Sequence, residues 1–234
     1  MSTNRKIALL SLGLSALELI SIFHDAQTQV AIAYCLLFLA LLGIFIYAAY
    51  RTSGPQFTTI SIKKTLVIHD HNASSANMTR EHKIRVNYGS IPEIWSRGIC
   101  SDGTIDNFMV DGETVPKCDQ IWSPGVVVDL RKRFSEAIFM DHETTVTWTY
   151  DLHDSFPERH EALDHDVIPG TRFVEMTVHL PTDRPCINAS LHVLVGGESV
   201  SQLEDPEISE DRKLLKARVK SPKAGQTLRL SWDW

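Results

Sequence analysis

Three consecutive cationic residues, Arg131, Lys132 and Arg133, form the densest basic cluster of this 234-residue sequence. Arginine binds phosphate through paired hydrogen bonds, and aromatic side chains stack on nucleobases. Trp95 and Trp122 come before the cluster in the sequence. Together with Arg131 and Arg133 they predict a binding site for a ligand that carries both phosphate and a base. The alternative is a solvated strand end beside core aromatic residues, which is the more usual role of large aromatics.

A second set of polar residues lies in an otherwise apolar segment near the N-terminus. Ser11, Ser15, Glu18 and Ser21 follow one another at steps of four, three and three, so a helix would place them along one face. An ionisable side chain within a membrane helix is costly and faces protein or water rather than lipid. This membrane polar seam is predicted to line a pore or to join protomers. Alternatively, Glu18 only pairs with the neighbouring helix.

Residues 151–166 are rich in His, Asp and Glu, including His153, His160 and Asp164. Imidazole and carboxylate groups are common metal ligands, but the H-E-x-x-H and cysteine-based zinc spacings are missing from the sequence. We therefore expect an acidic surface loop, and we predict no metal and no cofactor. A metal-dependent enzyme that uses this loop is kept as a weaker alternative.

The sequence contains no pattern that is typical of catalysis. It has no G-x-S-x-G elbow, no P-loop and no G-x-G-x-x-G turn. We predict that the protein is not an enzyme and that it has no catalytic residues.

Two apolar segments, residues 7–23 and 30–50, would position the membrane polar seam. The second runs over 21 residues without a charge, which is long enough for a helix to cross ~30 Å of hydrocarbon. Six residues, 24–29, connect the two segments. The pair therefore predicts a two-helix transmembrane hairpin over residues 1–51, with the lipid bilayer as a partner.

Positive charges flank this hairpin at Arg5, Lys6 and Arg51, whereas the connecting residues contain no Lys or Arg. Cytoplasmic loops of membrane proteins are the richer in these residues. Both termini of the chain are therefore expected in the cytoplasm.

After a linker at residues 52–56, residues 57–234 are predicted to form one cytoplasmic antiparallel β-domain. Apolar and polar residues alternate in several runs, such as 145–150 and 227–234, and this period of two is typical of half-buried strands. About ten strands are expected, arranged as a sandwich or a barrel. Asp102-Gly103 indicates a hairpin between two strands. Pro157 indicates a short helix over residues 157–165.

The charge balance limits the possible partners. Residues 52–234 contain 20 Lys and Arg against 27 Asp and Glu, a net charge of −7 with neutral His. A broad surface for DNA or RNA is not expected on that balance. A small anionic ligand in a local basic pocket is compatible with it.

The layout of a tight two-span hairpin followed by one β-domain resembles a known family. It is similar to the two-transmembrane, β-strand-rich effectors of the bacterial cyclic-oligonucleotide anti-phage systems (CBASS). The resemblance implies a bacterial inner-membrane protein whose β-domain binds a cyclic oligonucleotide made by a partner synthase. It further implies that binding drives the membrane helices to form a homo-oligomer that damages the membrane.

We therefore expect a membrane effector of anti-phage defence, with a sensing β-domain and membrane-disrupting helices. The alternative is a membrane-anchored protein-interaction module, in which the β-domain binds a protein and the helices are a passive anchor.

Overall fold

The computed structural model describes residues 26–52, 56–123 and 127–234. The chain divides into two compact units, residues 1–54 and 55–234, and each is described by itself. The division lies inside the linker expected at residues 52–56.

The described part of the first unit is one helix, α2 (Ala26–Thr52). It begins inside the connecting residues 24–29, which were expected to form a loop. The apolar residues 30–50, rich in Ala and Leu, do form a helix, as the propensities of these residues favour.

Within the described residues, none of the helical structure is long and apolar enough to cross a membrane. The predicted two-helix transmembrane hairpin is therefore wrong, and so is the two-span inner-membrane location derived from it. The first predicted segment, residues 7–23, lies outside the described residues.

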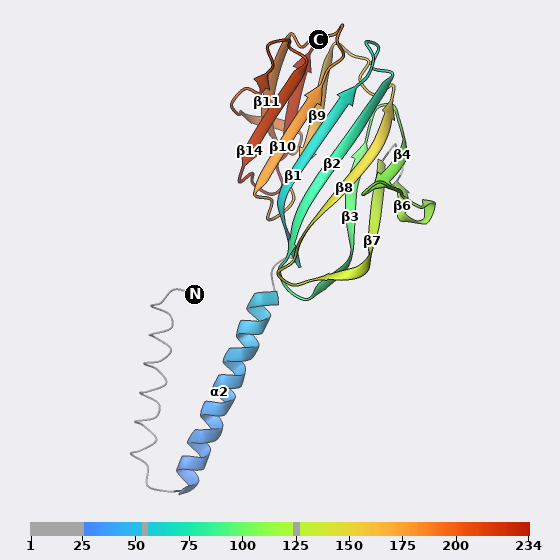
Figure 1. The fold of residues 1–234 in the computed structure, drawn as a ribbon. Helices are drawn as coiled ribbons and strands as arrows, with labels where there is room; N and C mark the ends of the chain where they lie inside the picture. Colours follow the sequence, from blue (N-terminus) through green and yellow to red (C-terminus); the bar gives the residue numbers. More distant parts are fainter. Residues whose placement is uncertain (1–25, 53–55, 124–126) are drawn as a thin grey trace. The chain divides into compact units, whose positions relative to one another are not determined.

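The described part of the second unit consists of three sheets (Figure 1). The eight-stranded sheet has the order β13-β14-β10-β1-β2-β8-β4-β5, the four-stranded sheet β12-β11-β15-β9, and the three-stranded sheet β3-β7-β6. A short 3-10 helix, η1 (Lys117–Asp119), precedes β6. The strands are β1 (Phe57–Ile68), β2 (Ser75–Val86), β3 (Ser90–Cys100), β4 (Thr104–Val110), β5 (Glu113–Thr114), β6 (Gln120–Ser123), β7 (Val127–Phe139), β8 (Glu143–His153), β9 (His160–Asp166), β10 (Phe173–His179), β11 (Asn188–Val195), β12 (Glu198–Gln202), β13 (Glu207–Ile208), β14 (Leu214–Lys220) and β15 (Thr227–Asp233).

Pairing in the large sheet departs from the expected antiparallel pattern at one place. Strand β1 pairs with β10 in parallel, with Leu66 opposite Val178, while β1 pairs with β2 antiparallel. The long crossover that parallel pairing requires is supplied here by residues 69–172, which include β2 to β9. The domain is therefore mixed rather than purely antiparallel.

Residues 160–166 form strand β9, so the short helix predicted over residues 157–165 is wrong. The burial of this strand alternates, with Glu161, Leu163 and His165 buried and His160, Asp164 and Asp166 exposed. Strand β9 pairs antiparallel with β15. Pairing with β15, which the local sequence does not reveal, decides between a helix and a strand for these residues.

One continuous core joins the three sheets. Buried hydrophobic side chains from each sheet belong to a single cluster, with Trp148 on β8, Leu130 on β7 and Trp232 on β15 all at most 1% exposed. The inward rows follow the period of two, as in β2, where every even-numbered residue from 76 to 86 is buried. The second unit therefore has an apolar interior against which any inward polar residue stands out.

Candidate anion-binding cavity

Four nitrogen-bearing side chains interrupt the inward rows. Lys64 lies in the row of β1, Arg80 and His82 lie in that of β2, and His165 lies in that of β9. Each residue is at most 8% exposed. Because charged side chains are rarely buried without a partner, we treat these four residues as the candidate site and call them the cationic cluster.

The sheet register brings the cationic cluster together. Lys64 is directly opposite Arg80 in the antiparallel pair of β1 and β2, which puts their Cβ atoms about 5 Å apart. His82 follows Arg80 on the same face of β2. The Nζ atom of Lys64 donates a hydrogen bond to the backbone oxygen of Asp164 at 2.5 Å. This bond links the large sheet to β9, where His165 is the next residue.

A cavity of about 1150 Å³ is lined by the cationic cluster. Its wall is formed by β1, β2 and β8 of the large sheet, by β3 of the three-stranded sheet, and by β9, β15 and β11 of the four-stranded sheet. Apolar and aromatic side chains such as Phe57, Ile94 and Tyr150 complete the lining. Small-molecule sites have this size and this mixture of apolar wall and few polar groups.

Several polar atoms of this region have no hydrogen-bond partner among the described residues. They are Nε of Arg80, Nε2 of His82, both ring nitrogens of His165 and Oγ1 of Thr59, all of them buried. A buried polar atom without a partner costs about 1–3 kcal/mol, and native structures contain few of them. The residues that carry these five atoms all line the cavity, so buried polar groups are concentrated around a space that a polar ligand could occupy.

Acidic residues also line the cavity, namely Glu93, Asp102, Glu158, Glu161, Asp164 and Asp166. Two of them, Asp164 and Asp166, have their carboxylates engaged elsewhere. The carboxylate of Asp164 accepts two hydrogen bonds from Arg229, at 2.8 and 2.6 Å. Asp166 accepts a hydrogen bond from the Thr227 hydroxyl at 2.6 Å. The salt bridges of the described residues do not include Lys64 or Arg80. The positive charge of the cluster is therefore not neutralised by direct pairing.

Burial and mutual repulsion set the protonation of the cluster. The pKa of the Lys64 amine is lowered from 10.5 to about 7, first by burial and then by the charge of Arg80, while the charges of Asp164 and Asp166 oppose this shift. Burial, followed by the charges of Lys64 and Arg80, lowers the pKa of His165 from 6.5 to about 2. Burial also places the pKa of His82 well below 6.5. At neutral pH both imidazoles are therefore neutral, and Arg80 holds the permanent charge.

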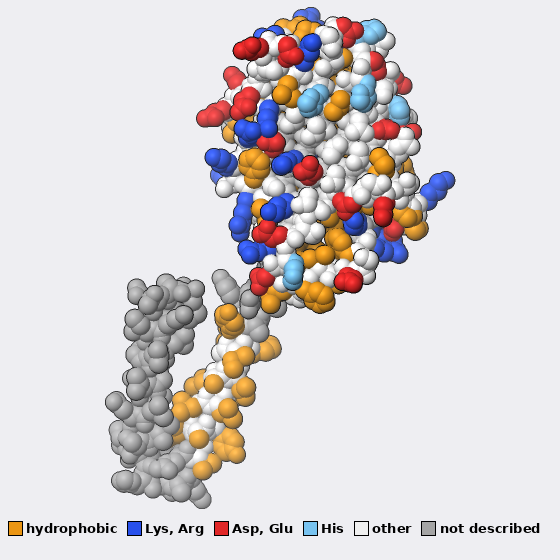
Figure 2. Space-filling model, in the orientation of Figure 1, with side chains coloured by type: hydrophobic (Ala, Val, Ile, Leu, Met, Phe, Trp, Pro, Cys, Tyr) orange, Lys and Arg blue, Asp and Glu red, His pale blue; other side chains and the backbone are white. Residues whose placement is uncertain are grey.

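This arrangement has the chemistry of an anion site. A buried guanidinium offers hydrogen-bond donors to phosphate or carboxylate, and the neutral imidazoles each offer a donor and an acceptor. On the outer surface, by contrast, Lys and Arg side chains are interspersed with Asp and Glu on the face shown (Figure 2). Lys64 and Arg80 differ from these surface residues in being buried.

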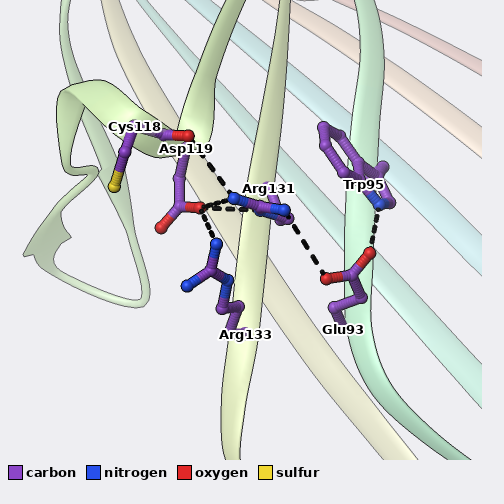
Figure 3. A network of polar contacts seen from close by, with 6 residues as sticks. All are labelled: Glu93, Trp95, Cys118, Asp119, Arg131 and Arg133. Atoms are coloured by element: carbon purple, nitrogen blue, oxygen red, sulfur yellow. Dashed lines mark hydrogen bonds and ion pairs between the residues drawn. The ribbon is translucent and has the colours of Figure 1, made fainter.

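Three of the residues predicted to bind a ligand do lie together, in the three-stranded sheet (Figure 3). The guanidinium carbon of Arg131 lies 5.2 Å from the ring centroid of Trp95. Arg131 and Arg133 both contact the same oxygen of Asp119, at 2.6 and 3.3 Å, and Arg131 also lies 3.9 Å from Glu93. The two arginines thus have carboxylate partners of their own.

The other predicted site residues are placed elsewhere or lie outside the described residues. Trp122 is on β6, opposite Val128, with its ring in edge contact with Phe108 at a centroid distance of 5.9 Å. Trp95 also lines the cavity, whereas Trp122 does not. The membrane polar seam, which comprises Ser11, Ser15, Glu18 and Ser21, lies outside the described residues.

The acidic and histidine-rich residues 151–166 do not converge. His153 pairs with Asp106 at 3.0 Å and His160 pairs with Asp233 at 2.9 Å. Within the ranges that the structure describes, no group of three His, Cys, Asp or Glu residues is arranged to hold a metal ion.

The cationic cluster was missed at the sequence level, although a signal for it exists. Lys64 stands between Ile62 and Leu66 in a row of period two, and Arg80 with His82 stand between Met78 and Ile84 in another. A search for alternation that counts only apolar positions ends each strand at these residues. If the alternation is followed through polar residues as well, Lys64, Arg80 and His82 are identified at inward positions of longer strands.

Comparison with known proteins gives little beyond a distant structural likeness. No protein family matches the sequence, and no curated protein matches it. The similar solved structures include an M1 zinc metallopeptidase from Deinococcus radiodurans, at 10% identity and a TM-score of 0.39 over 75% of this chain and 42% of that one. A putative protease from Parabacteroides distasonis has 9% identity and a TM-score of 0.42 over 76% and 40% of the two chains.

Yeast LTA4 hydrolase in complex with bestatin has 8% identity and a TM-score of 0.43 over 75% of this chain and 28% of that one. The chain spans less than half the length of each of these proteins. The prediction that the protein is not an enzyme is contradicted by these neighbours, which are by name a zinc metallopeptidase, a putative protease and a hydrolase. At this level of likeness, however, their activities are not carried over to this chain.

Proposed function

We propose that the second unit is a receptor for a small anionic ligand, which it binds in the cavity lined by the cationic cluster. The single observation that carries the proposal is the convergence of Lys64, Arg80, His82 and His165 on one cavity with five buried polar atoms unpartnered. A bound anion would accept hydrogen bonds from the unpartnered donors. It would also supply the negative charge that Arg80 lacks.

A cyclic oligonucleotide, the ligand implied by the resemblance to CBASS effectors, belongs to this class of ligands. Its phosphates suit Arg80, and its bases suit the aromatic part of the wall, where Trp95, Phe57 and Tyr150 lie. The membrane-disrupting step that the resemblance also implies is not carried further, because the predicted transmembrane hairpin is wrong.

The test is calorimetric titration of the full chain with inorganic pyrophosphate and with a panel of cyclic di- and trinucleotides. The variant Arg80→Met removes the permanent charge of the cluster and keeps an apolar stem. The matched control is Arg85→Met, because Arg85 lies on the same strand with its side chain 47% exposed. Loss of a buried charged contact costs at least about 2 kcal/mol, so we expect Arg80→Met to weaken binding about 30-fold or more.

Two outcomes would overturn the proposal. One is the absence of binding by every anion in the panel. The other is equal loss of affinity in Arg80→Met and Arg85→Met, which would place the anion on the surface rather than in the cavity.

A protein-binding role is the second candidate, because β6 carries exposed apolar residues. Ile121 and Trp122 are 47% and 50% exposed on the edge strand of the three-stranded sheet. An exposed edge with large apolar side chains is a place where a partner strand can pair. Replacement of Trp122 by Ser should abolish partner capture without changing anion binding if this role is the correct one.

A further inference from the structure

Lys64 is placed in an unusual way for a lysine. It occupies the inward row of β1 between Ile62 and Leu66, which are at most 1% exposed, and it is itself only 8% exposed. Its side chain lines the cavity and does not extend into solvent at the outer surface. A lysine at a surface position extends its ammonium group into water, so the position of Lys64 requires another explanation.

Burial and the charge of Arg80 favour the uncharged form of Lys64, against the opposing charges of Asp164 and Asp166. Its described hydrogen bond goes to a backbone oxygen, that of Asp164, whose carboxylate is held by Arg229. Directly across the strand pair stands the guanidinium-bearing Arg80. The pKa of Lys64, lowered to about 7 by burial and by Arg80, leaves about half of the amine uncharged at neutral pH.

An uncharged lysine amine in a cavity is a nucleophile. Desolvation and an adjacent cation are the two arrangements by which proteins activate lysine toward carbonyl groups, and Lys64 has both. His82 and His165 lie beside it in the cavity wall with unpartnered ring nitrogens. Neutral imidazoles offer one hydrogen-bond donor and one acceptor each, which can orient the carbonyl group against the amine.

We propose that Lys64 forms a Schiff base with the aldehyde or ketone group of a small anionic compound whose charge is held by Arg80. The amine nitrogen attacks the carbonyl carbon and gives a carbinolamine. The carbinolamine then loses one molecule of water, which takes the carbonyl oxygen and the two hydrogens that the neutral amine carried. A C=N bond remains. The inference rests on the proposed anion site and adds a covalent step to it.

This covalent role differs in a measurable way from simple charge contact. If Lys64 only contacts the anion as a cation, an anion with a carbonyl group and one without it behave alike. If Lys64 is a nucleophile, only the carbonyl compound gives an adduct that borohydride can fix. Hydride addition to the C=N bond converts the Schiff base to a stable secondary amine.

The experiment treats the full chain at pH 7 with a low concentration of pyridoxal 5′-phosphate, which carries an aldehyde and a phosphate, followed by borohydride. Peptide mass spectrometry then measures the adduct on each lysine. Lys63 is the internal control, because it is the neighbouring residue on the same strand with a side chain 50% exposed. An ordinary lysine is uncharged to about one part in 2500 at pH 7, so we expect Lys64 to be labelled at least ~10-fold more than Lys63.

Excess inorganic pyrophosphate should suppress the adduct on Lys64 and leave that on Lys63 unchanged. Two variants keep the test independent of folding: Lys63→Arg should retain the Lys64 adduct, and Lys64→Arg should lose it while still binding pyrophosphate. Equal labelling of the two lysines would overturn the covalent role.

A parallel titration with pyridoxine 5′-phosphate, which lacks the aldehyde, separates the two proposals. Binding of this compound that depends on Arg80, without any Lys64 adduct from the aldehyde, refutes the Schiff base and leaves the anion site standing. Absence of binding by both compounds and by pyrophosphate refutes both proposals.

Discussion

Replacement of Lys64 by methionine should change how the stability of the second unit depends on pH. The pKa of the Lys64 amine is about 7 in the folded protein and 10.5 without burial. Between these values the unfolded chain binds the proton more strongly, so this residue makes the folded state more stable as pH rises through that window. The cost of the buried charge is fully present below pH 7. At about 1.4 kcal/mol per pKa unit, the whole window corresponds to about 5 kcal/mol, and the part from pH 7 to 9 to about 3 kcal/mol.

Methionine keeps a similar volume in the inward row of β1 and cannot carry a charge. Relative to the wild type, Lys64→Met should therefore be most favourable at pH 7 and should lose about 3 kcal/mol of that advantage by pH 9. Urea denaturation of the full chain at each pH measures the free energy of unfolding. Lys63→Met is the matched control, and its difference from wild type should stay constant with pH. If the difference in unfolding free energy between Lys64→Met and wild type is equally constant with pH, burial does not lower the pKa of the Lys64 amine. That result would refute the proposed protonation of the cationic cluster.

Three further predictions concern other parts of the second unit. His165→Leu should reduce the acid sensitivity of folding. Because burial lowers the pKa of His165 from 6.5 to about 2, only the unfolded chain takes up this proton as pH falls below 6.5. Between pH 6.5 and 4.5 the wild type should therefore lose about 3 kcal/mol more unfolding free energy than the variant in urea denaturation; an equal loss in both would contradict this. Asp119→Asn leaves Arg131 and Arg133 without the carboxylate they share and should cost about 2 kcal/mol of unfolding free energy, whereas no loss would show that solvent replaces it. Gly103→Ala places a Cβ atom 1.8 Å from the backbone oxygen of His153 and should cost about 3 kcal/mol, measured as a fall in Tm; an unchanged Tm would show that the turn relaxes freely.

Some strands could be predicted from the sequence because their alternation is complete. In β8 the even-numbered residues Val146, Trp148 and Tyr150 are buried, as the period of two indicates. The strands that carry the site are different, because Lys64, Arg80 and His82 occupy inward positions where an apolar residue is expected. The local pattern breaks at the residues on which the proposed function depends.

Other features follow from pairing between distant segments, which local sequence does not encode. Asp102-Gly103 has the composition of a hairpin turn, yet the strands on either side of it belong to different sheets, since β3 pairs with β7 and β4 pairs with β8. Strand β9 was predicted as a helix because the segment 157–165 is short and begins with Pro157, a residue common in the first turn of a helix. The cavity itself is lined by strands of all three sheets, and no motif marks such an arrangement.

Nuclear magnetic resonance of the histidine rings can show whether an anion binds within the cationic cluster. The full chain would be titrated with inorganic pyrophosphate while the imidazole signals of His82 and His165 are followed, with the exposed His142 as the reference. We expect saturable shifts at His82 and His165, abolished in Arg80→Met, and no shift at His142. Shifts confined to exposed histidines, or none at any histidine, would contradict it.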